Sequence, residues 1–421
     1  MLNIGDIEPP IVRQLNRIRI PGYYTIISDS GVPIYYIKSN IPVIKISYVN
    51  IIQPDYKSLC SNYVTSKMLL EGTVDHTYVQ ISDIIDFYGA CLSTSSYASY
   101  NCISLLVLRK FFDKTFNLLN EIVDSSTFEE DRLEHIKTLD VEQLHVEQTE
   151  NKIIATKLFK EKLFGANNPY GWYRDEQSIN NTSRMDLLNA HGLYWRGNCS
   201  VFACGTIDDN IIDQINSHMS RKLGHNDMGY ENVYSFNNKE QSMYVEKPDS
   251  TQTSVRIGKF LIPMMHDDYK KLWCTIAFLG GYFGSRLMKN IREKNGYTYG
   301  IGASLIPNNY ISYVIIKSSV KKEYRDTVRE EIIKEINRLK HDNIDDKELY
   351  GFKQFFMGNM YSQMSDPINV MSQYKILKIF GIPDSYYKSL FNTIMNISKE
   401  DIRDMATKYL SCNDLTTVMV G

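Results

Sequence analysis

One order of secondary-structure elements recurs in the two halves of this 421-residue chain. Short alternating runs such as Pro33–Ile37 predict half-buried strands in the first half, and Ile311–Ser318 predicts a strand in the second. Amphipathic helices follow in both halves, and each half closes with a strand ending at a glycine, Gly205 or Gly421. Because this length exceeds one ordinary core, the repeat predicts an α+β fold of two homologous domains in tandem, each an antiparallel sheet packed with helices.

The repeat also sets the predicted domain boundaries. The first domain spans 1–207 and the second 253–421. The segment 208–252 is rich in Asn, Asp, Lys and Ser, and we interpret it as an edge segment and linker. In each half a Ser-x-x-Asp sequence, at 183–186 and at 398–401, has the spacing of a capping box and predicts the start of the last helix.

Overall composition limits the partners of the chain. A net charge of -2 provides no field for nucleic acid or an anionic membrane, so neither is expected as a partner. No signal-peptide pattern and no apolar run of membrane-spanning length occurs in the sequence, so we expect a cytoplasmic location. The seven cysteines are scattered in apolar segments without a Cys-x-x-Cys pair, which predicts reduced core thiols rather than disulfides or a cysteine metal site.

The stretch from Gly280 to Tyr299 is the most informative part of the sequence. It begins with glycines, predicts a short helix that ends near Lys294 with Gly296 in the C-terminal cap, and continues as a strand. The glycines are not followed by the Lys-Ser/Thr of a nucleotide-binding loop. Arg292 near the helix end and Tyr299 in the strand are therefore the candidate functional side chains, directed into one cleft.

These motifs resemble a known family. Two homologous α+β halves, with Gly-Ser-Arg-Leu at 284–287 and Ile-Arg-Glu-Lys-Asn-Gly-Tyr-Thr-Tyr at 291–299, resemble the inverzincin metallopeptidases that include pitrilysin, insulin-degrading enzyme and mitochondrial processing peptidase. The Leu-Leu-Glu-Gly-Thr at 69–73 resembles the segment that follows the family's zinc helix. The resemblance covers nearly the whole chain and implies half of a clam-shell peptidase.

The zinc-binding motif of that family is degenerate here. In active members an H-x-x-E-H helix precedes the Gly-Thr, and the corresponding positions hold Tyr63, Ser66 and Lys67. These three share one helix face, but an ammonium has no lone pair, a neutral phenol is a poor ligand, and a serine hydroxyl is no general base. Glu142 falls at about the position of the distal zinc-ligand glutamate, and we interpret it as an exposed carboxylate. We expect no metal to bind to this chain.

A displaced catalytic centre is not apparent either. The eight histidines form no H-E-x-x-H or H-x-x-E-H pair, and there is no Gly-x-Ser-x-Gly nucleophile elbow. One hypothesis for this chain is a peptidase with a metal site of its own. The absence of these motifs makes it weaker than the two hypotheses that follow from the family resemblance.

The resemblance implies a function for the retained pair. In the family an Arg and a Tyr from the half facing the zinc helix hold the substrate backbone and stabilise the oxyanion, and these roles carry over to Arg292 and Tyr299. Some members divide the work between subunits. We therefore expect the non-zinc subunit of a heterodimeric metallopeptidase, with zinc in a homologous partner and peptides as substrates. The alternative is a catalytically inactive scaffold or peptide-binding protein.

Overall fold

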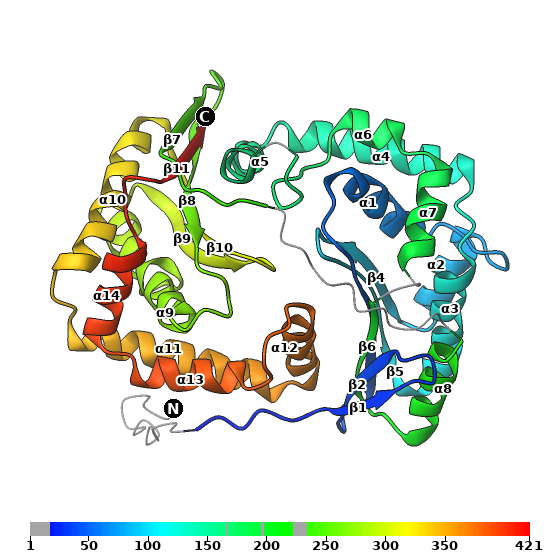
Figure 1. The fold of residues 1–421 in the computed structure, drawn as a ribbon. Helices are drawn as coiled ribbons and strands as arrows, with labels where there is room; N and C mark the ends of the chain where they lie inside the picture. Colours follow the sequence, from blue (N-terminus) through cyan, green and yellow to red (C-terminus); the bar gives the residue numbers. More distant parts are fainter. Residues whose placement is uncertain (1–16, 166, 195–197, 222–233) are drawn as a thin grey trace, which may run out of the picture.

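The computed structural model describes residues 17–165, 167–194, 198–221 and 234–421. Figure 1 shows two halves side by side, each a twisted sheet covered by helices. The predicted α+β fold with two homologous halves is confirmed.

The first half is built on a six-stranded sheet in the order β1-β2-β6-β3-β5-β4. Its strands are β1 (Tyr24–Ile27), β2 (Pro33–Lys38), β3 (Val43–Ile51), β4 (Cys91–Ser96), β5 (Tyr100–Leu108) and β6 (Asn198–Gly205). Its helices are α1 (Leu59–Met68), α2 (Tyr78–Phe87), α3 (Phe112–Ser125), α4 (Glu130–Glu147), α5 (Asn151–Phe164), α6 (Glu176–Asn181), α7 (Arg184–Tyr194) and α8 (Asp209–Met219), with short 3₁₀ turns η2 (Tyr56–Ser58) and η3 (Arg109–Phe111).

The second half is built on a five-stranded sheet in the order β7-β11-β8-β10-β9. Its strands are β7 (Gln241–Val245), β8 (Gln252–Leu261), β9 (Thr298–Pro307), β10 (Ser312–Lys321) and β11 (Thr416–Val420). Its helices are α9 (Tyr269–Gly280), the π-helix η4 (Met288–Lys294), α10 (Arg325–His341), α11 (Asp346–Ser365), α12 (Pro367–Ile379), α13 (Tyr386–Asn396) and α14 (Lys399–Tyr409), with one 3₁₀ turn, η5 (Lys322–Tyr324).

The two sheets have the same topology. In each, the last strand is parallel to an edge-side neighbour (β6 with β2, β11 with β7) and antiparallel to the central strand (β6 with β3, β11 with β8). Both central strands then pair with the second strand of a hairpin, β5 or β10. The segment 208–252 contains α8, whose apolar face packs into the first core, and β7, the edge strand of the second sheet.

The halves exchange one helix each. Helix α5 belongs to the first half in sequence, but it packs against β8 and β11 of the second sheet. Helix α12 belongs to the second half and packs against β2 and β6 of the first sheet. Both helices lie between the sheets in Figure 1. The exchange buries apolar residues such as Phe159 of α5 across the boundary, so the two halves are joined by core packing rather than by the linker alone.

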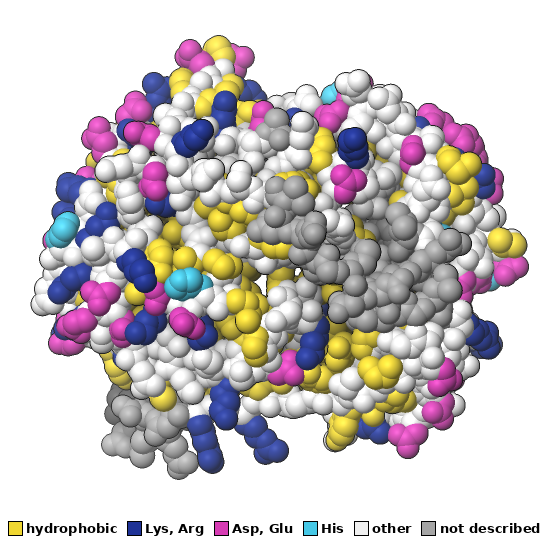
Figure 2. Space-filling view, viewed as in Figure 1, with side chains coloured by type: hydrophobic (Ala, Val, Ile, Leu, Met, Phe, Trp, Pro, Cys, Tyr) yellow, Lys and Arg dark blue, Asp and Glu magenta, His cyan; other side chains and the backbone are white. Residues whose placement is uncertain are grey.

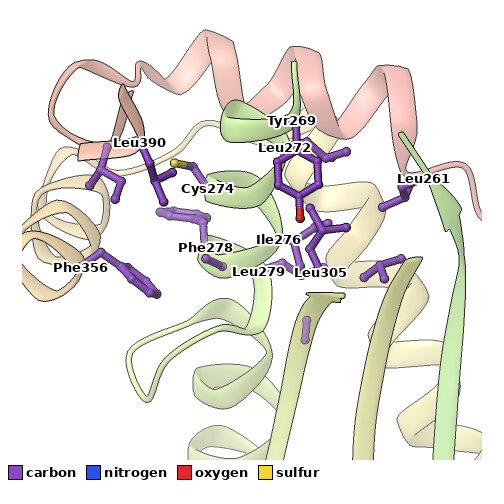
Figure 3. Close-up of a cluster of buried hydrophobic side chains, with 14 of the residues drawn as sticks. Leu261, Tyr269, Leu272, Cys274, Ile276, Phe278, Leu279, Leu305, Phe356 and Leu390 are labelled. Carbon is purple, nitrogen blue, oxygen red and sulfur yellow. The ribbon is translucent and has the colours of Figure 1, made fainter. Parts of the chain in front are cut away.

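The core of the second half is apolar around α9. Figure 3 shows Leu272, Phe278 and Leu279 of α9 between Leu305 of β9 and side chains of the surrounding helices, including Phe356 and Leu390. This packing fixes the position of the loop and π-helix that follow α9. Within the described residues, none of the helices is both long and apolar enough to cross a membrane.

Candidate functional site

Arg292 lies in the last turn of η4, so the predicted short helix is present and is a π-helix. Backbone bonds from Asn295 to Asn290 (3.1 Å) and from Tyr297 to Ile291 (3.0 Å) widen the turn, and Gly296, with φ of 66°, ends it as predicted. The guanidinium stacks on the exposed ring of Phe283, 4.6 Å from its centroid. Within the described part of the chain it makes no hydrogen bond or ion pair, so its donors remain available to a ligand.

Tyr299 is the second residue of strand β9 and is 91% exposed. The neighbouring Thr298 is buried, and the Thr298 hydroxyl donates a hydrogen bond to the Ser319 carbonyl (2.6 Å). The side chains of Thr298 and Tyr299 therefore turn to opposite faces. Tyr297 packs instead on the ring of Tyr324, 4.8 Å away. Tyr299 and not Tyr297 is therefore the tyrosine presented to solvent.

Arg286, six residues before Arg292, has a structural role. It forms an ion pair with Glu348 of α11 (3.2 Å), and both side chains are largely buried. The same guanidinium lies over Phe278, 5.4 Å from the ring centroid. This contact ties the glycine-rich loop to the core and leaves Arg292 as the accessible arginine of the motif.

On α1 the degenerate positions Tyr63 and Lys67 meet a buried carboxylate. Asp140 of α4 accepts a hydrogen bond from the Tyr63 hydroxyl (2.8 Å). The same carboxylate forms an ion pair with the Lys67 ammonium (2.5 Å). Burial and the bond to Asp140 raise the pKa of Tyr63. The Asp140 side chain is only 1% exposed, so this network occupies the polar face of α1.

A second carboxylate extends the network. The Nε atom of Arg174 lies 3.5 Å from Oδ1 of Asp140. The Nη2 atom of the same guanidinium donates a hydrogen bond to Oε1 of Glu147 of α4 (2.7 Å). Glu147 also accepts from the hydroxyl of Tyr173 (2.7 Å). Burial favours the neutral form of Glu147, but these hydrogen bonds outweigh it and lower the pKa of the carboxyl.

The fold is shared with several solved structures. The crystal structure of a peptidase M16 inactive domain from Pseudomonas fluorescens matches with a TM-score of 0.85 over 95% of this chain and 98% of that one, at 20% identity. A protease from Helicobacter pylori matches with a TM-score of 0.86 over 96% and 100%, at 15% identity. The periplasmic protease PqqL from Escherichia coli matches all of this chain with 48% of its own, at a TM-score of 0.73 and 13% identity.

The sequence comparison agrees with the fold comparison. Residues 183–355 match the family model described as Peptidase M16 inactive domain. This chain is similar to M16 peptidases over that segment. A Helicobacter pylori protein named as a non-peptidase homolog, YmxG, is 26% identical to it over 85% of this chain and 83% of its own. A Bacillus subtilis protein named as a zinc protease, also YmxG, is 21% identical over 73% and 75%. The resemblance found from the motifs is confirmed.

The residues of this chain do not suit a zinc ion on α1. Lys67 brings a positive charge where a metal needs a donor, and Asp140 is already shared by Lys67 and Tyr63. Ser66 is buried and donates to the Tyr63 carbonyl (2.7 Å), so its hydroxyl serves the helix itself. Within the described ranges, no group of three or more His, Cys, Asp or Glu side chains could hold a metal ion.

The structure also shows which α4 carboxylates face α1. Glu142 lies on the exposed side of α4, whereas Asp140 contacts Tyr63 and Lys67. Glu147 lies on the same side as Asp140 and is reached through Arg174. Sequence reasoning missed Asp140 and Glu147, although their spacing of seven residues, two helical turns, is a signal for one shared helix face.

Proposed function

We propose that this chain is the non-zinc subunit of a heterodimeric zinc metallopeptidase and supplies Arg292 and Tyr299 to a shared peptide-digesting chamber. The observation that carries the proposal is the 91% exposure of Tyr299 on a strand that pairs regularly with β10 from Ile301 to Pro307. A tyrosine this exposed adds little to folding. Arg292, stacked on an exposed phenylalanine, likewise adds little to the core.

The length of the chain supports an assembly of two such chains. PqqL, a single chain described as a protease, is matched by this chain over only 48% of its length. Two chains of the present size would supply the same amount of structure. The α1 network described above leaves the catalytic metal to the other chain.

The chemistry of the pair fits the role. A guanidinium and a phenol are hydrogen-bond donors that can be directed at the charge developing on a scissile carbonyl oxygen. Arg292 can hold the substrate carbonyl with two donors in one plane, and Tyr299 can add a third from the strand. Neither group moves a proton in this scheme, because the partner subunit supplies the activated water.

The test is reconstitution with a homologue that bears an intact H-x-x-E-H motif. We expect the mixture to cleave a quenched peptide library and the single chain to leave it intact. Arg292→Ala and Tyr299→Phe should each lower kcat by about a hundredfold to a thousandfold, because each removes one oxyanion donor. Matched controls are Arg325→Ala, an arginine that stacks on Tyr244, and Tyr350→Phe, a tyrosine that is 55% exposed on α11. Full activity of the mixture that contains Arg292→Ala would contradict the proposed role of Arg292 in stabilising the oxyanion.

The second candidate function is a scaffold or peptide-binding protein without a catalytic role. It is supported by the name of the relative from Helicobacter pylori, a non-peptidase homolog, and by the ion pairs on α1. A stable but inactive complex with every H-x-x-E-H partner tried would favour this function. The cytoplasmic location stays a prediction from the sequence.

A further inference from the structure

A small cavity lies within the second half, between the end of β9 and helices α9, α11, α12 and α13. Its volume is about 230 Å³, and none of the described side chains around it is charged. Its wall includes Trp273 and Met360, and Figure 3 shows three more of its residues, Tyr269 of α9, Phe356 of α11 and Leu390 of α13. An apolar cavity of about 150 Å³ can hold benzene, so this one has room for an aromatic ring with a polar substituent.

Two buried tyrosines of this wall have hydroxyls that the protein leaves unpaired. Tyr269 is 2% exposed and Tyr386 is 7% exposed, and neither hydroxyl makes a hydrogen bond within the part of the chain that the structure describes. A third tyrosine of the wall, Tyr387, donates its hydroxyl hydrogen bond to the side-chain carbonyl of Gln373. Because a buried hydroxyl without a partner costs free energy, a bound group that pairs with Tyr269 and Tyr386 would remove that cost.

The chemistry of the wall favours a neutral aromatic group. Burial raises the pKa of Tyr269 and of Tyr386, so both remain neutral phenols, and each can donate and accept one hydrogen bond. A charged group would lose its hydration here without meeting an opposite charge. The rings of Trp273 and Phe356 meet edge to face with centroids 5.2 Å apart, and the nearby thioether of Met360 also packs well on a ring. A phenol combines such a ring with a hydroxyl that both donates and accepts.

The cavity adjoins the space between the halves. Pro307, the last residue of β9, lines this cavity and also a larger space of about 430 Å³ that is bordered by Tyr97 and Trp172 of the first half. Figure 2 shows hydrophobic side chains around the hollow at the centre of the molecule. Asn359 and Gln363 of α11 line the cavity and are exposed, so the cavity reaches the surface. An entering group therefore does not have to cross the core.

We propose that this cavity binds one neutral phenol group, with the ring against Trp273 and Met360 and the hydroxyl bonded to Tyr269 and Tyr386. The phenol is either the side chain of a peptide tyrosine or a small free molecule, since both sources present the same chemistry. Binding requires this chain alone. The proposal therefore goes beyond the proposed function and depends neither on a partner subunit nor on Arg292.

The experiment measures binding to the purified full chain by isothermal titration calorimetry. The probes are p-cresol and toluene, which differ by one hydroxyl. We expect p-cresol to bind about tenfold more tightly, because its hydroxyl gains hydrogen bonds that toluene cannot make. Tyr269→Phe and Tyr386→Phe should each weaken p-cresol binding about fivefold and leave toluene binding unchanged. The matched control is Tyr313→Phe, which alters an equally buried tyrosine of the larger space and should change neither.

A second pair of probes, N-acetyl-tyrosinamide and N-acetyl-phenylalaninamide, separates the two sources of the phenol. Hydroxyl-dependent binding of the tyrosine amide would identify a peptide side chain, and binding of p-cresol without the amide would identify a small free phenol. Equal binding of p-cresol and toluene, no binding of p-cresol, or unchanged p-cresol binding in both Tyr→Phe variants of the cavity would overturn the inference. Both variants should keep the melting temperature of the unmodified chain. A lower value would show that the hydroxyls bond within the protein, which would also overturn it.

Discussion

Helices α1 and α9 hold the same place in the two halves and have opposite chemistry. Each follows the central strand of its sheet and packs on the helix that precedes the parallel-paired strand β6 or β11, namely α7 or α14. Helix α9 buries an almost wholly apolar surface, including Leu272 and Phe278. Helix α1 buries Asn62, Thr65 and Ser66, and its other polar face binds Asp140.

The difference shows that the fold does not require a polar α1. Helix α9 demonstrates that the same position is filled stably by apolar side chains, which need no buried carboxylate opposite them. The network of Lys67, Tyr63 and Asp140 is thus a specific feature of the first half. Asp140 neutralises the ammonium of Lys67, and Glu147 neutralises the guanidinium of Arg174.

The largest expected change converts the α1 face into a metal site. In Tyr63→His with Lys67→His, two imidazoles one helical turn apart would face the Asp140 carboxylate, which contacts both positions. We expect about one zinc per chain after dialysis, measured by atomic absorption, against no stoichiometric zinc in the unmodified chain. Adding Asp140→Asn should abolish the gain. Failure of the histidine pair to retain zinc would show that α1 has lost the geometry as well as the ligands.

The next effect concerns the apolar helix. Phe278 is 1% exposed in the core around α9, and Phe278→Ala should lower the free energy of unfolding by about 3–5 kcal/mol because it leaves a cavity. The control is Ser66→Ala on α1, which removes only a hydroxyl bonded within its own helix and should cost less than about 1 kcal/mol. Urea denaturation measures both. Equal losses would mean that the polar face of α1 contributes as much to stability as the apolar face of α9.

The smallest expected effect is a difference between the two halves in how their stability depends on pH. His218 of α8 is buried against Tyr48 and Phe116 in the first half, and burial with nearby Arg221 lowers its pKa to about 4. Between pH 6.5 and 4 the unfolded chain binds a proton that the folded chain does not, so stability falls as the pH is lowered, by roughly 2–3 kcal/mol.

The second core contains no histidine among its described buried residues, so hydrogen exchange should show acid weakening the first half before the second. His218→Gln should flatten the pH dependence of stability, whereas His135→Gln, at an exposed position of α4, should leave it unchanged. Acid weakening of both halves together would contradict this separation.

Local patterns predicted many elements correctly and their breaks less well. The strand around Pro33 and the helix that ends near Lys294 follow the predicted ranges. Helix α11 ends at Ser365, a break for which no prediction was made, where Asp366 caps α12 and Pro367 occupies its first turn. That signal was in the sequence, since proline ends a helix before it and starts one well.

Sequence alone determined the duplicated α+β fold, the family resemblance and the unsuitability of Tyr63, Ser66 and Lys67 as zinc ligands, because periodicity, capping and donor chemistry are local properties. Tertiary structure decided which sheet each exchanged helix covers. An amphipathic pattern shows that one face of a helix is buried, but it does not show which element that face packs against. It also decided that Asp140 neutralises Lys67. Such contacts join residues far apart in the chain, so only the packed fold brings their charges together.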